Sequence, residues 1–134
     1  MQKYYMGLES NMIGVAGEYR VISELILRGH YPAKPLSVKR ADLILENGTR
    51  LEIKTSRFYK DDNAYKFDIT YGHGRVKIDQ DFYDYLICWC LDVQTFFIVP
   101  SNMIDAQSTV SITLSPNSKY APYREAWNLL EKER

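Results

Sequence analysis

Two carboxylates and a lysine occupy a segment whose pattern otherwise predicts two short apolar strands around a turn. Residues 40–57 read RADLILENGTRLEIKTSR, and this segment places Asp42, Glu52 and Lys54 inside the predicted strands. Charged side chains at such positions contribute nothing to a hydrophobic face, so they need another reason to be there. Carboxylate oxygens bind hard divalent cations, and an ammonium group can orient water or stabilise negative charge.

The register of this hairpin decides which residues face each other. The Asn-Gly turn permits a two-residue loop, which would set Asp42 opposite Ile53 and mix polar with apolar residues across the strands. A three-residue loop, with Gly48 in the left-handed conformation, sets Asp42 opposite Glu52 instead. We prefer this second register because it gathers four apolar side chains on one face: Leu43, Leu45, Leu51 and Ile53.

The preferred register places two carboxylates directly across from each other, with Cβ atoms about 5 Å apart. Like charges at this distance destabilise a sheet unless a cation lies between them. Oxygen ligands of this kind suit Mg²⁺, with Mn²⁺ as a substitute. Lys54 lies two residues beyond Glu52 and therefore projects to the same face.

A fourth charged residue lies on the first predicted helix, over residues 11–28. Glu18 has small or apolar helical neighbours, so its carboxylate should have a partner. If this helix packs over the polar face of the hairpin, Glu18 approaches Lys54 or a metal. Gly14 and Gly17 would then permit close approach of the helix. Alternatively, Asp42, Glu52 and Lys54 lie on an ordinary solvent-facing strand and Glu18 lies at the edge of a helix. Chance seldom produces this combination of four charged residues.

These residues resemble the signature of the PD-(D/E)XK nuclease superfamily, an acid on the first helix followed by Asp and then Glu-x-Lys across a hairpin. Ala41 stands where that signature has proline. The segments ADLIL and LEIKTS are similar to archaeal Holliday-junction resolvases. The later segments YKFDITYGHGR, DFYDYLICWCLDVQTFFIVP and SNMI are similar to intron-associated homing endonucleases. The resemblance extends over about residues 10–105.

The resemblance implies an α/β fold of the restriction-endonuclease type and Mg²⁺-dependent hydrolysis of DNA. Its mixed β-sheet would carry the N-terminal helix on the active-site face. Asp42, Glu52 and the carbonyl of Ile53 would hold the metal, Glu18 would complete its shell, and Lys54 would act on water or phosphate. The opposing class is a noncatalytic nucleic-acid-binding or assembly module that keeps this fold.

Basic residues downstream of the motif are candidates for phosphate contacts. Each could equally be a solvated loop charge, and the histidine among them is more typical of a turn residue than of a catalytic base. They are Arg57, Lys60, His73, Arg75 and Lys77.

The remaining pattern predicts a single domain over residues 1–134, long enough to bury a core. Strands are expected at 41–46, 50–56 and 64–72, then a hairpin of 83–92 with 94–100, then a peripheral strand at 109–114. An amphipathic helix is expected over 123–134. Cys88 and Cys90 should be reduced core residues on one face of a strand, with Trp89 on the other.

Charge and composition restrict the partners and the compartment. Residues 1–77 carry 13 Lys and Arg against 9 Asp and Glu, whereas residues 78–134 carry 4 against 8. This asymmetry permits a local basic surface for a polyanion. No apolar stretch is long enough for a membrane span and no secretory signal is recognisable, so a cytoplasmic protein is expected.

Cutting two strands would be easiest for a homodimer, because one small domain supplies one active site. The expected interface is either the second hairpin or the C-terminal helix, with Trp127, Leu129 and Leu130.

Overall fold

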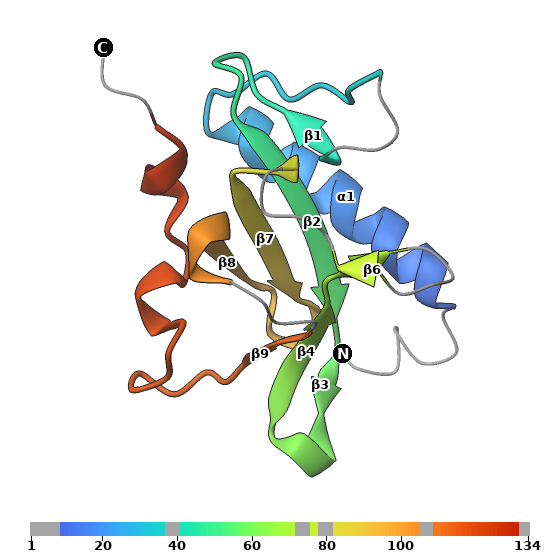
Figure 1. The fold of residues 1–134 in the computed structure, drawn as a ribbon, viewed down its shortest axis with the longest axis vertical. Coiled ribbons are helices and arrows are strands. Elements are labelled where there is room, and N and C mark those ends of the chain that lie inside the picture. Colours follow the sequence, from blue (N-terminus) through green and yellow to red (C-terminus); the bar gives the residue numbers. More distant parts are fainter. Residues whose placement is uncertain (1–8, 37–40, 72–75, 78–81, 105–108, 132–134) are drawn as a thin grey trace.

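The chain folds as one long helix beside a mixed β-sheet, with a second sheet beneath it (Figure 1). The computed structural model describes residues 9–36, 41–71, 76–77, 82–104 and 109–131. The α-helix is α1 (Ser10–Leu27). The strands are β1 (Leu43–Ile44), β2 (Arg50–Ser56), β3 (Phe58–Tyr59), β4 (Ala64–Asp68), β5 (Thr70–Tyr71), β6 (Val76–Lys77), β7 (Tyr85–Cys90), β8 (Thr95–Pro100) and β9 (Thr109–Ile112).

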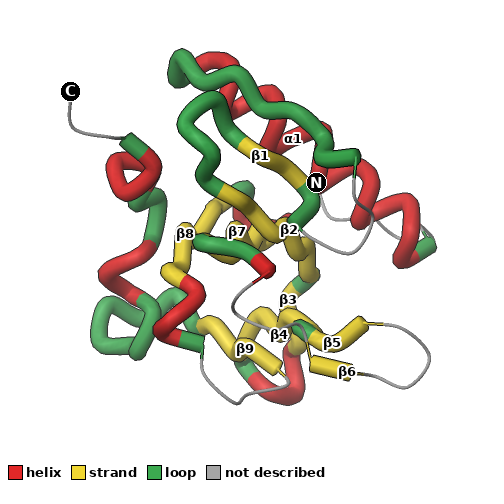
Figure 2. The backbone as a smooth tube through the Cα atoms, turned by 45° about the horizontal axis from the view of Figure 1, so that its top comes forward, coloured by secondary structure: helices red, strands yellow, loops and turns green. Residues whose placement is uncertain are grey.

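The central sheet has the strand order β1-β2-β7-β8. Strands β2 and β7 are parallel, whereas β1 with β2 and β7 with β8 are antiparallel, so the sheet is mixed. A three-stranded sheet of order β3-β4-β9 and the β5–β6 pair lie below it in Figure 2. The α/β class, the mixed sheet, the N-terminal helix and the hairpin of β7 with β8 are therefore as predicted.

The central sheet separates two hydrophobic clusters. One face of β7 carries Ile87 and Trp89 into the cluster shared with α1. The other face carries Cys88 and Cys90 toward the second sheet, where Phe67 lies. Both cysteines are free and buried, which confirms the sequence prediction.

The hairpin of β1 and β2 adopts the three-residue loop. Leu43 pairs with Leu51, and Gly48 has a φ of 87° and donates its N–H to the Leu45 carbonyl at 2.9 Å. The φ value lies in the left-handed region, where glycine carries no steric penalty. The predicted apolar face also forms, since Leu43, Leu45, Leu51 and Ile53 all belong to the cluster beneath α1.

Helix α1 packs on the apolar face of β2 and not on the polar one, so this part of the sequence prediction is wrong. Val21 and Leu25 are fully buried in the same cluster as Leu51 and Ile53. Because side chains alternate along a strand, Glu52 and Lys54 project from the opposite face. The helix needs apolar cover for its own buried residues, and the polar face of β2 cannot supply it.

The two helix glycines differ. A Cβ on Gly17 would overlap the Thr55 hydroxyl, so close packing on β2 requires glycine there. A Cβ on Gly14 would meet nothing within 4 Å, and the predicted close approach at Gly14 is wrong.

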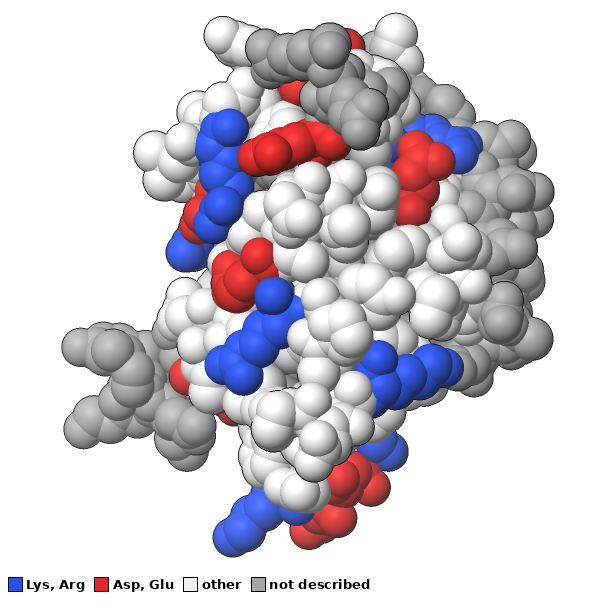
Figure 3. Space-filling model, turned by 90° about the vertical axis from the view of Figure 1, so that its left-hand side faces the viewer, with Lys and Arg blue, Asp and Glu red and all other residues white. Residues whose placement is uncertain are grey.

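The surface that carries the C-terminal segment mixes both signs of charge. Figure 3 shows acidic and basic side chains close to one another on this face, among the described residues. The described residues of this face therefore form no continuous basic patch of the kind that nonspecific polyanion binding requires. No helix in the described part of the chain is both long and apolar enough to cross a membrane.

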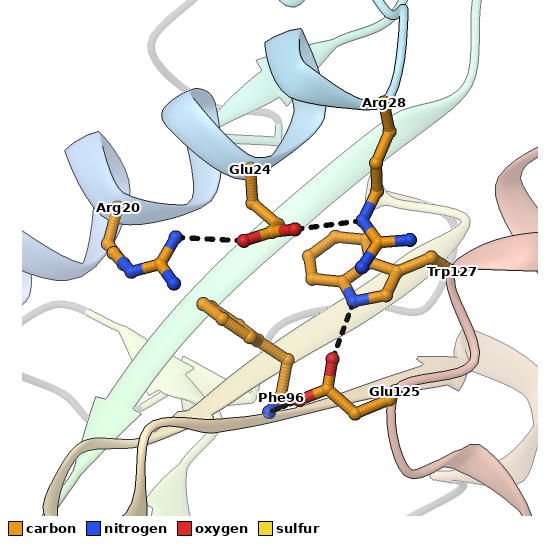
Figure 4. A network of polar contacts seen from close by, with 6 residues as sticks. All are labelled: Arg20, Glu24, Arg28, Phe96, Glu125 and Trp127. Atoms are coloured by element: carbon orange, nitrogen blue, oxygen red, sulfur yellow. Dashed lines mark hydrogen bonds and ion pairs between the residues drawn. The ribbon is translucent and has the colours of Figure 1, made fainter.

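The predicted C-terminal α-helix does not form. The segment contains two 3-10 turns, Ala121–Tyr123 and Trp127–Leu130. Between them Glu125 has a φ of 50°, and its carboxylate accepts hydrogen bonds from the Phe96 N–H at 2.9 Å and the Trp127 indole N–H at 2.8 Å (Figure 4). The bond from Phe96, together with the bond of 2.7 Å that the Glu125 N–H donates to the Phe96 carbonyl, ties the segment to β8 in place of the hydrogen bonds of a continuous helix.

Two of the three residues expected at a dimer interface on this segment are buried within the chain, whereas Leu129 is partly buried. Trp127 and Leu130 are only 4% and 2% exposed because both belong to the cluster beneath α1. A second copy cannot reach side chains that the chain already buries.

Candidate active site

The candidate active site lies just before the first residue of β1, where the edge of β2 is no longer paired with β1. β1 pairs with β2 only through Leu43 and Ile44. Asp42 lies one residue before β1, and its Oδ2 accepts a hydrogen bond of 2.8 Å from the Ile53 N–H, where a longer β1 would have placed a main-chain carbonyl. The N–H and C=O of one strand residue point to the same side, so the Ile53 carbonyl faces this edge too.

Glu52 and Lys54 project from the face of β2 opposite α1. Glu52 is 9% exposed, and its Oε2 lies 3.7 Å from the Lys54 Nζ. Their register partners on β7, Leu86 and Cys88, are fully buried. The charged pair therefore lies at the margin of a hydrophobic cluster, where water is largely excluded.

Glu18 reaches the same charged group from α1. Its Oε1 lies 3.4 Å from the Lys34 Nζ, and its charge contributes to the pKa shifts of both Asp42 and Glu52. The helix packs on the other face of β2, but β1 is too short to separate Glu18 from the edge. Asp42, Glu52 and Lys54 thus lie on one side of β2, and Glu18 is near enough for its charge to raise the pKa of both acids while its own contact is with Lys34.

The two central carboxyls resist ionisation. Burial and the nearby charges of Asp42 and Glu18 raise the pKa of Glu52 to about 8, although Lys54 acts in the opposite direction. Burial raises the pKa of Asp42 as well; the Ile53 N–H, Lys54 and Lys34 counteract this effect, whereas Glu18 adds to it. If Glu18, Asp42 and Glu52 were all ionised, their negative charge would exceed what Lys34 and Lys54 compensate, so a bound cation would favour the ionised form of these acids.

Within the described residues, no group of three or more His, Cys, Asp and Glu side chains is arranged to hold a metal ion. Two carboxylates and one main-chain carbonyl form the donor set that the described residues offer at this edge. The predicted metal site and its ligands stay a prediction.

The sequence analysis missed Lys34 and Tyr83. Ala33 pairs with Ile44 through hydrogen bonds of 2.9 and 2.8 Å, which extends the edge beside β1 and places Lys34 next to Glu18. The prolines on both sides of Lys34 were a usable signal for this extended path. Burial raises the pKa of Tyr83 to about 12, with a contribution from the charge of Glu52, and no local pattern indicates that these two residues lie near each other.

The predicted DNA contacts fall into two groups. Arg57 is partly buried and lines a cleft of about 460 Å³ that also includes Ser10, Tyr59 and Lys66, whereas Lys60 is exposed in the turn between β3 and β4.

The other three predicted contacts are His73, Arg75 and Lys77. His73 and Arg75 are outside the described residues, and Lys77 lies in β6, where side chains are not described.

Comparison with known proteins shows the fold. Neither a protein-family model nor a curated protein sequence matches this chain. Among solved structures the chain is similar to the bacterial homing endonuclease I-Ssp6803I, with a TM-score of 0.78 and 19% sequence identity. The similarity covers 92% of this chain and 93% of that one. The fold predicted from the sequence is thereby supported over almost the whole length.

Proposed function

We propose that this protein is a metal-dependent endonuclease that hydrolyses phosphodiester bonds in DNA. The observation that carries the proposal is that Asp42, Glu52 and Lys54 lie together at one open sheet edge, where burial and the charges of Asp42 and Glu18 raise the pKa of Glu52 to about 8. Ionising all of these acids in the buried site is costly without a cation, which is why the pKa of Glu52 is raised. The shared fold with a protein named as a homing endonuclease adds independent support.

The donor set fits Mg²⁺, with Mn²⁺ as a substitute. Mg²⁺ is commonly held by one or two carboxylates, together with water and substrate phosphate oxygens. Asp42, Glu52 and the Ile53 carbonyl supply that number of protein ligands from one edge. Glu18 is already paired with Lys34, so we assign it to the outer part of the shell, through water.

The residues of the chain would divide the work as follows. Bound Mg²⁺ would polarise a phosphoryl oxygen and lower the pKa of water. Asp42 is held in one orientation by the Ile53 N–H. Glu52 positions the Lys54 ammonium group. From that position Lys54 can donate a hydrogen bond to the attacking water or stabilise the negative charge that develops on the phosphate.

Duplex DNA is the proposed substrate. The cleft lined by Thr55, Ser56 and Arg57 lies at the end of β2, and its Arg57 side chain is assigned to a phosphate that flanks the scissile bond. Lys66 and Asp68 also line this cleft, and Lys66 is paired with Asp62 at 3.1 Å. The name of the structural neighbour favours a homing or restriction-like enzyme over a four-way-junction resolvase. A noncatalytic module would gain nothing from a buried and mutually repelling acid pair.

Cleavage assays with purified protein test this function. Supercoiled, linear and four-way-junction DNA are incubated with Mg²⁺ or with EDTA, and the products are separated by electrophoresis. We expect cleavage of duplex DNA with Mg²⁺ only. Lys54→Ala and Asp42→Ala should lower the rate by about 100-fold or more, as removal of one transition-state donor or metal ligand does elsewhere.

Lys119→Ala is the matched control, because Lys119 lies on Tyr120 in the C-terminal segment, away from the acids. It should cleave as fast as wild type. Undiminished cleavage by Lys54→Ala would overturn the mechanism. Tight DNA binding without cleavage of any substrate would favour the noncatalytic module, and cleavage confined to junctions would favour a resolvase.

A further inference from the structure

Residues 30–35 follow α1 and run beside β1, on the edge of β1 that faces away from β2. Ala33 and Ile44 exchange two main-chain hydrogen bonds, of 2.9 and 2.8 Å, in an isolated antiparallel bridge. Residue numbers run in opposite directions across an antiparallel pair, so the chain after Ala33 proceeds toward Asp42. The bridge therefore directs Lys34 to the start of β1, just beyond which the candidate active site lies.

A second anchor holds the other end of this segment. The Glu46 carboxylate, in the turn of the hairpin, accepts a hydrogen bond of 2.8 Å from the Tyr31 N–H and lies 2.9 Å from the His30 Nδ1. The Tyr31 N–H above all, and then His30, lower the pKa of Glu46 to about 2, so the anchor stays ionised at neutral pH. Pro35 adds a local restraint, because the residue before a proline avoids the helical conformation and here that residue is Lys34.

The Lys34 ammonium lies at the solvent-facing side of the acids. Its Nζ is 3.4 Å from the Glu18 Oε1 and 5.9 Å from the centroid of the Tyr19 ring. Burial raises the pKa of Asp42, and the charges of Lys54 and Lys34 both counteract this effect. The Lys34 side chain is 63% exposed, against 26% for Lys54. An ammonium group has three donors, so the contact with Glu18 leaves others for a ligand from solvent.

A lysine next to a proline at a sheet edge also has a purely structural use, since both residues keep other strands from pairing there. That use places no requirement on where the ammonium lies. Here the main chain of Lys34 is fixed on both sides, and the ammonium lies beside Glu18 and near enough to act on Asp42. A phosphodiester that enters this site brings negative charge next to the acids, and a cation at the rim compensates that charge.

We propose that Lys34 binds a DNA phosphate next to the scissile bond and that Glu46 is the residue that positions it. The inference rests on the proposed function, because it takes DNA as the ligand of this site. Lys34 keeps its contact with Glu18 in the free protein and offers its remaining donors to the phosphate. It thereby joins Arg57 among the described residues that are assigned to phosphates.

DNA binding without metal tests the phosphate contact independently of cleavage. Fluorescence anisotropy of a labelled duplex is measured in EDTA between about 50 and 200 mM salt, which gives the slope of the logarithm of the association constant against the logarithm of the salt concentration. Lys34→Gln should weaken binding several-fold and reduce the magnitude of this slope by about 1, because one phosphate contact is lost.

Two further variants separate charge at this position from charge elsewhere. Lys34→Arg keeps the cation and should keep the wild-type slope. Lys119→Gln is the matched control, because Lys119 lies on Tyr120 in the C-terminal segment, and it should also keep the slope. The Tm of Lys34→Gln should lie within about 2 °C of wild type, since an exposed ion pair adds little stability.

Glu46→Ala gives a test of opposite sign. Loss of a carboxylate ordinarily strengthens the binding of DNA, as we expect for Glu131→Ala at an exposed position. Glu46→Ala should instead weaken binding, because residues 30–35 lose their anchor and Lys34 is no longer held at the site. The double variant Lys34→Gln, Glu46→Ala should bind no more weakly than Lys34→Gln alone, because Glu46 acts through Lys34.

A wild-type salt slope for Lys34→Gln would overturn the phosphate contact, and so would a loss of binding that is accompanied by a large fall in Tm. Tighter binding of DNA by Glu46→Ala would overturn the positioning role. A chain that cleaves DNA while Lys34→Gln keeps the wild-type slope would refute this inference and leave the nuclease proposal standing. A chain that shows the expected losses of binding but cleaves no DNA would do the reverse.

Discussion

The Glu52 carboxyl shows how a candidate active site costs stability before any ligand binds. Its pKa is raised to about 8, because it is buried next to Asp42 and Glu18, and Lys54 offsets this only in part. In the unfolded chain the same group ionises near its ordinary value of 4.5. Between these two values the folded protein binds a proton that the unfolded chain does not.

The free energy of unfolding should therefore fall as the pH rises. The contribution of Glu52 to the free energy of unfolding is fully present below about pH 4.5 and is lost between pH 4.5 and about pH 8, because the unfolded state binds fewer protons than the folded state in this window. Above about pH 8 this contribution no longer changes with pH. The pKa of Asp42 is also raised, so it adds to the same trend. Urea denaturation of the metal-free protein from pH 5 to 9 should show a loss of a few kcal/mol.

Glu52→Gln separates this effect from the background of other titrating groups. The variant should lose most of the pH dependence, and Mg²⁺ should stabilise the wild type but not the variant at pH 8. Glu131→Gln, at an exposed position, should keep the wild-type slope. Identical slopes for wild type and Glu52→Gln would show that Glu52 is not perturbed as described.

At the scale of single elements, α1 is positioned by one glycine. A Cβ at Gly17 would overlap the Thr55 hydroxyl, whereas a Cβ at Gly14 would meet open space. Gly17→Ala should destabilise the protein by about 1–3 kcal/mol, because overpacking outweighs the gain in helix propensity. Gly14→Ala, three residues away on the same helix, should stabilise it by up to about 1 kcal/mol.

Thermal denaturation of the two variants measures this difference directly. The double variant Gly17→Ala, Thr55→Ala removes the overlapping hydroxyl and should recover part of the loss. If Gly17→Ala were as stable as Gly14→Ala, the helix would not be held at the distance that the structure shows.

The hairpin was predictable because its signals are local. Period-two alternation and one glycine with positive φ fix its register, and Leu43 pairs with Leu51 as expected. The face that α1 covers was not predictable in the same way. A partner for Glu18 was anticipated, but the sequence alone could not show that Glu18 reaches the acids around a strand as short as β1.

The prediction of a C-terminal α-helix was wrong for a different reason. Its apolar spacing is helical, yet Trp127 and Leu130 reach the core through a 3-10 turn, and Glu125 adopts a φ of 50°. The hydrogen bonds that fix this path come from β8, about 30 residues earlier in the chain. Local propensity carries no information about such distant partners. The candidate acids were identified because a charge in an apolar strand is itself a local signal.

At the scale of the whole molecule, the C-terminal segment joins α1 to β8. The Arg28 guanidinium lies 4.9 Å from the Trp127 ring centroid, and Arg20 lies 5.2 Å from that of Phe96 (Figure 4). The Glu125 carboxylate accepts hydrogen bonds from the Phe96 N–H and the Trp127 indole. One carboxylate thus holds both aromatic residues on which the two arginines of the helix rest.

Glu125→Ala should destabilise this junction without touching the active site. It leaves two partly buried N–H donors without their acceptor, which should cost about 2 kcal/mol or more and lower Tm by roughly 6–10 °C. Glu125→Gln keeps one oxygen and should lose less, and Glu131→Ala should leave Tm unchanged.

Below its Tm, Glu125→Ala should still cleave DNA at the wild-type rate, because Glu18 and Lys54 are positioned by β1, β2 and the side of α1 that faces away from the C-terminal segment. A Tm within about 2 °C of wild type would show that the segment is held by its apolar contacts alone. A loss of cleavage in the folded variant would instead show that this junction positions Glu18 through the helix.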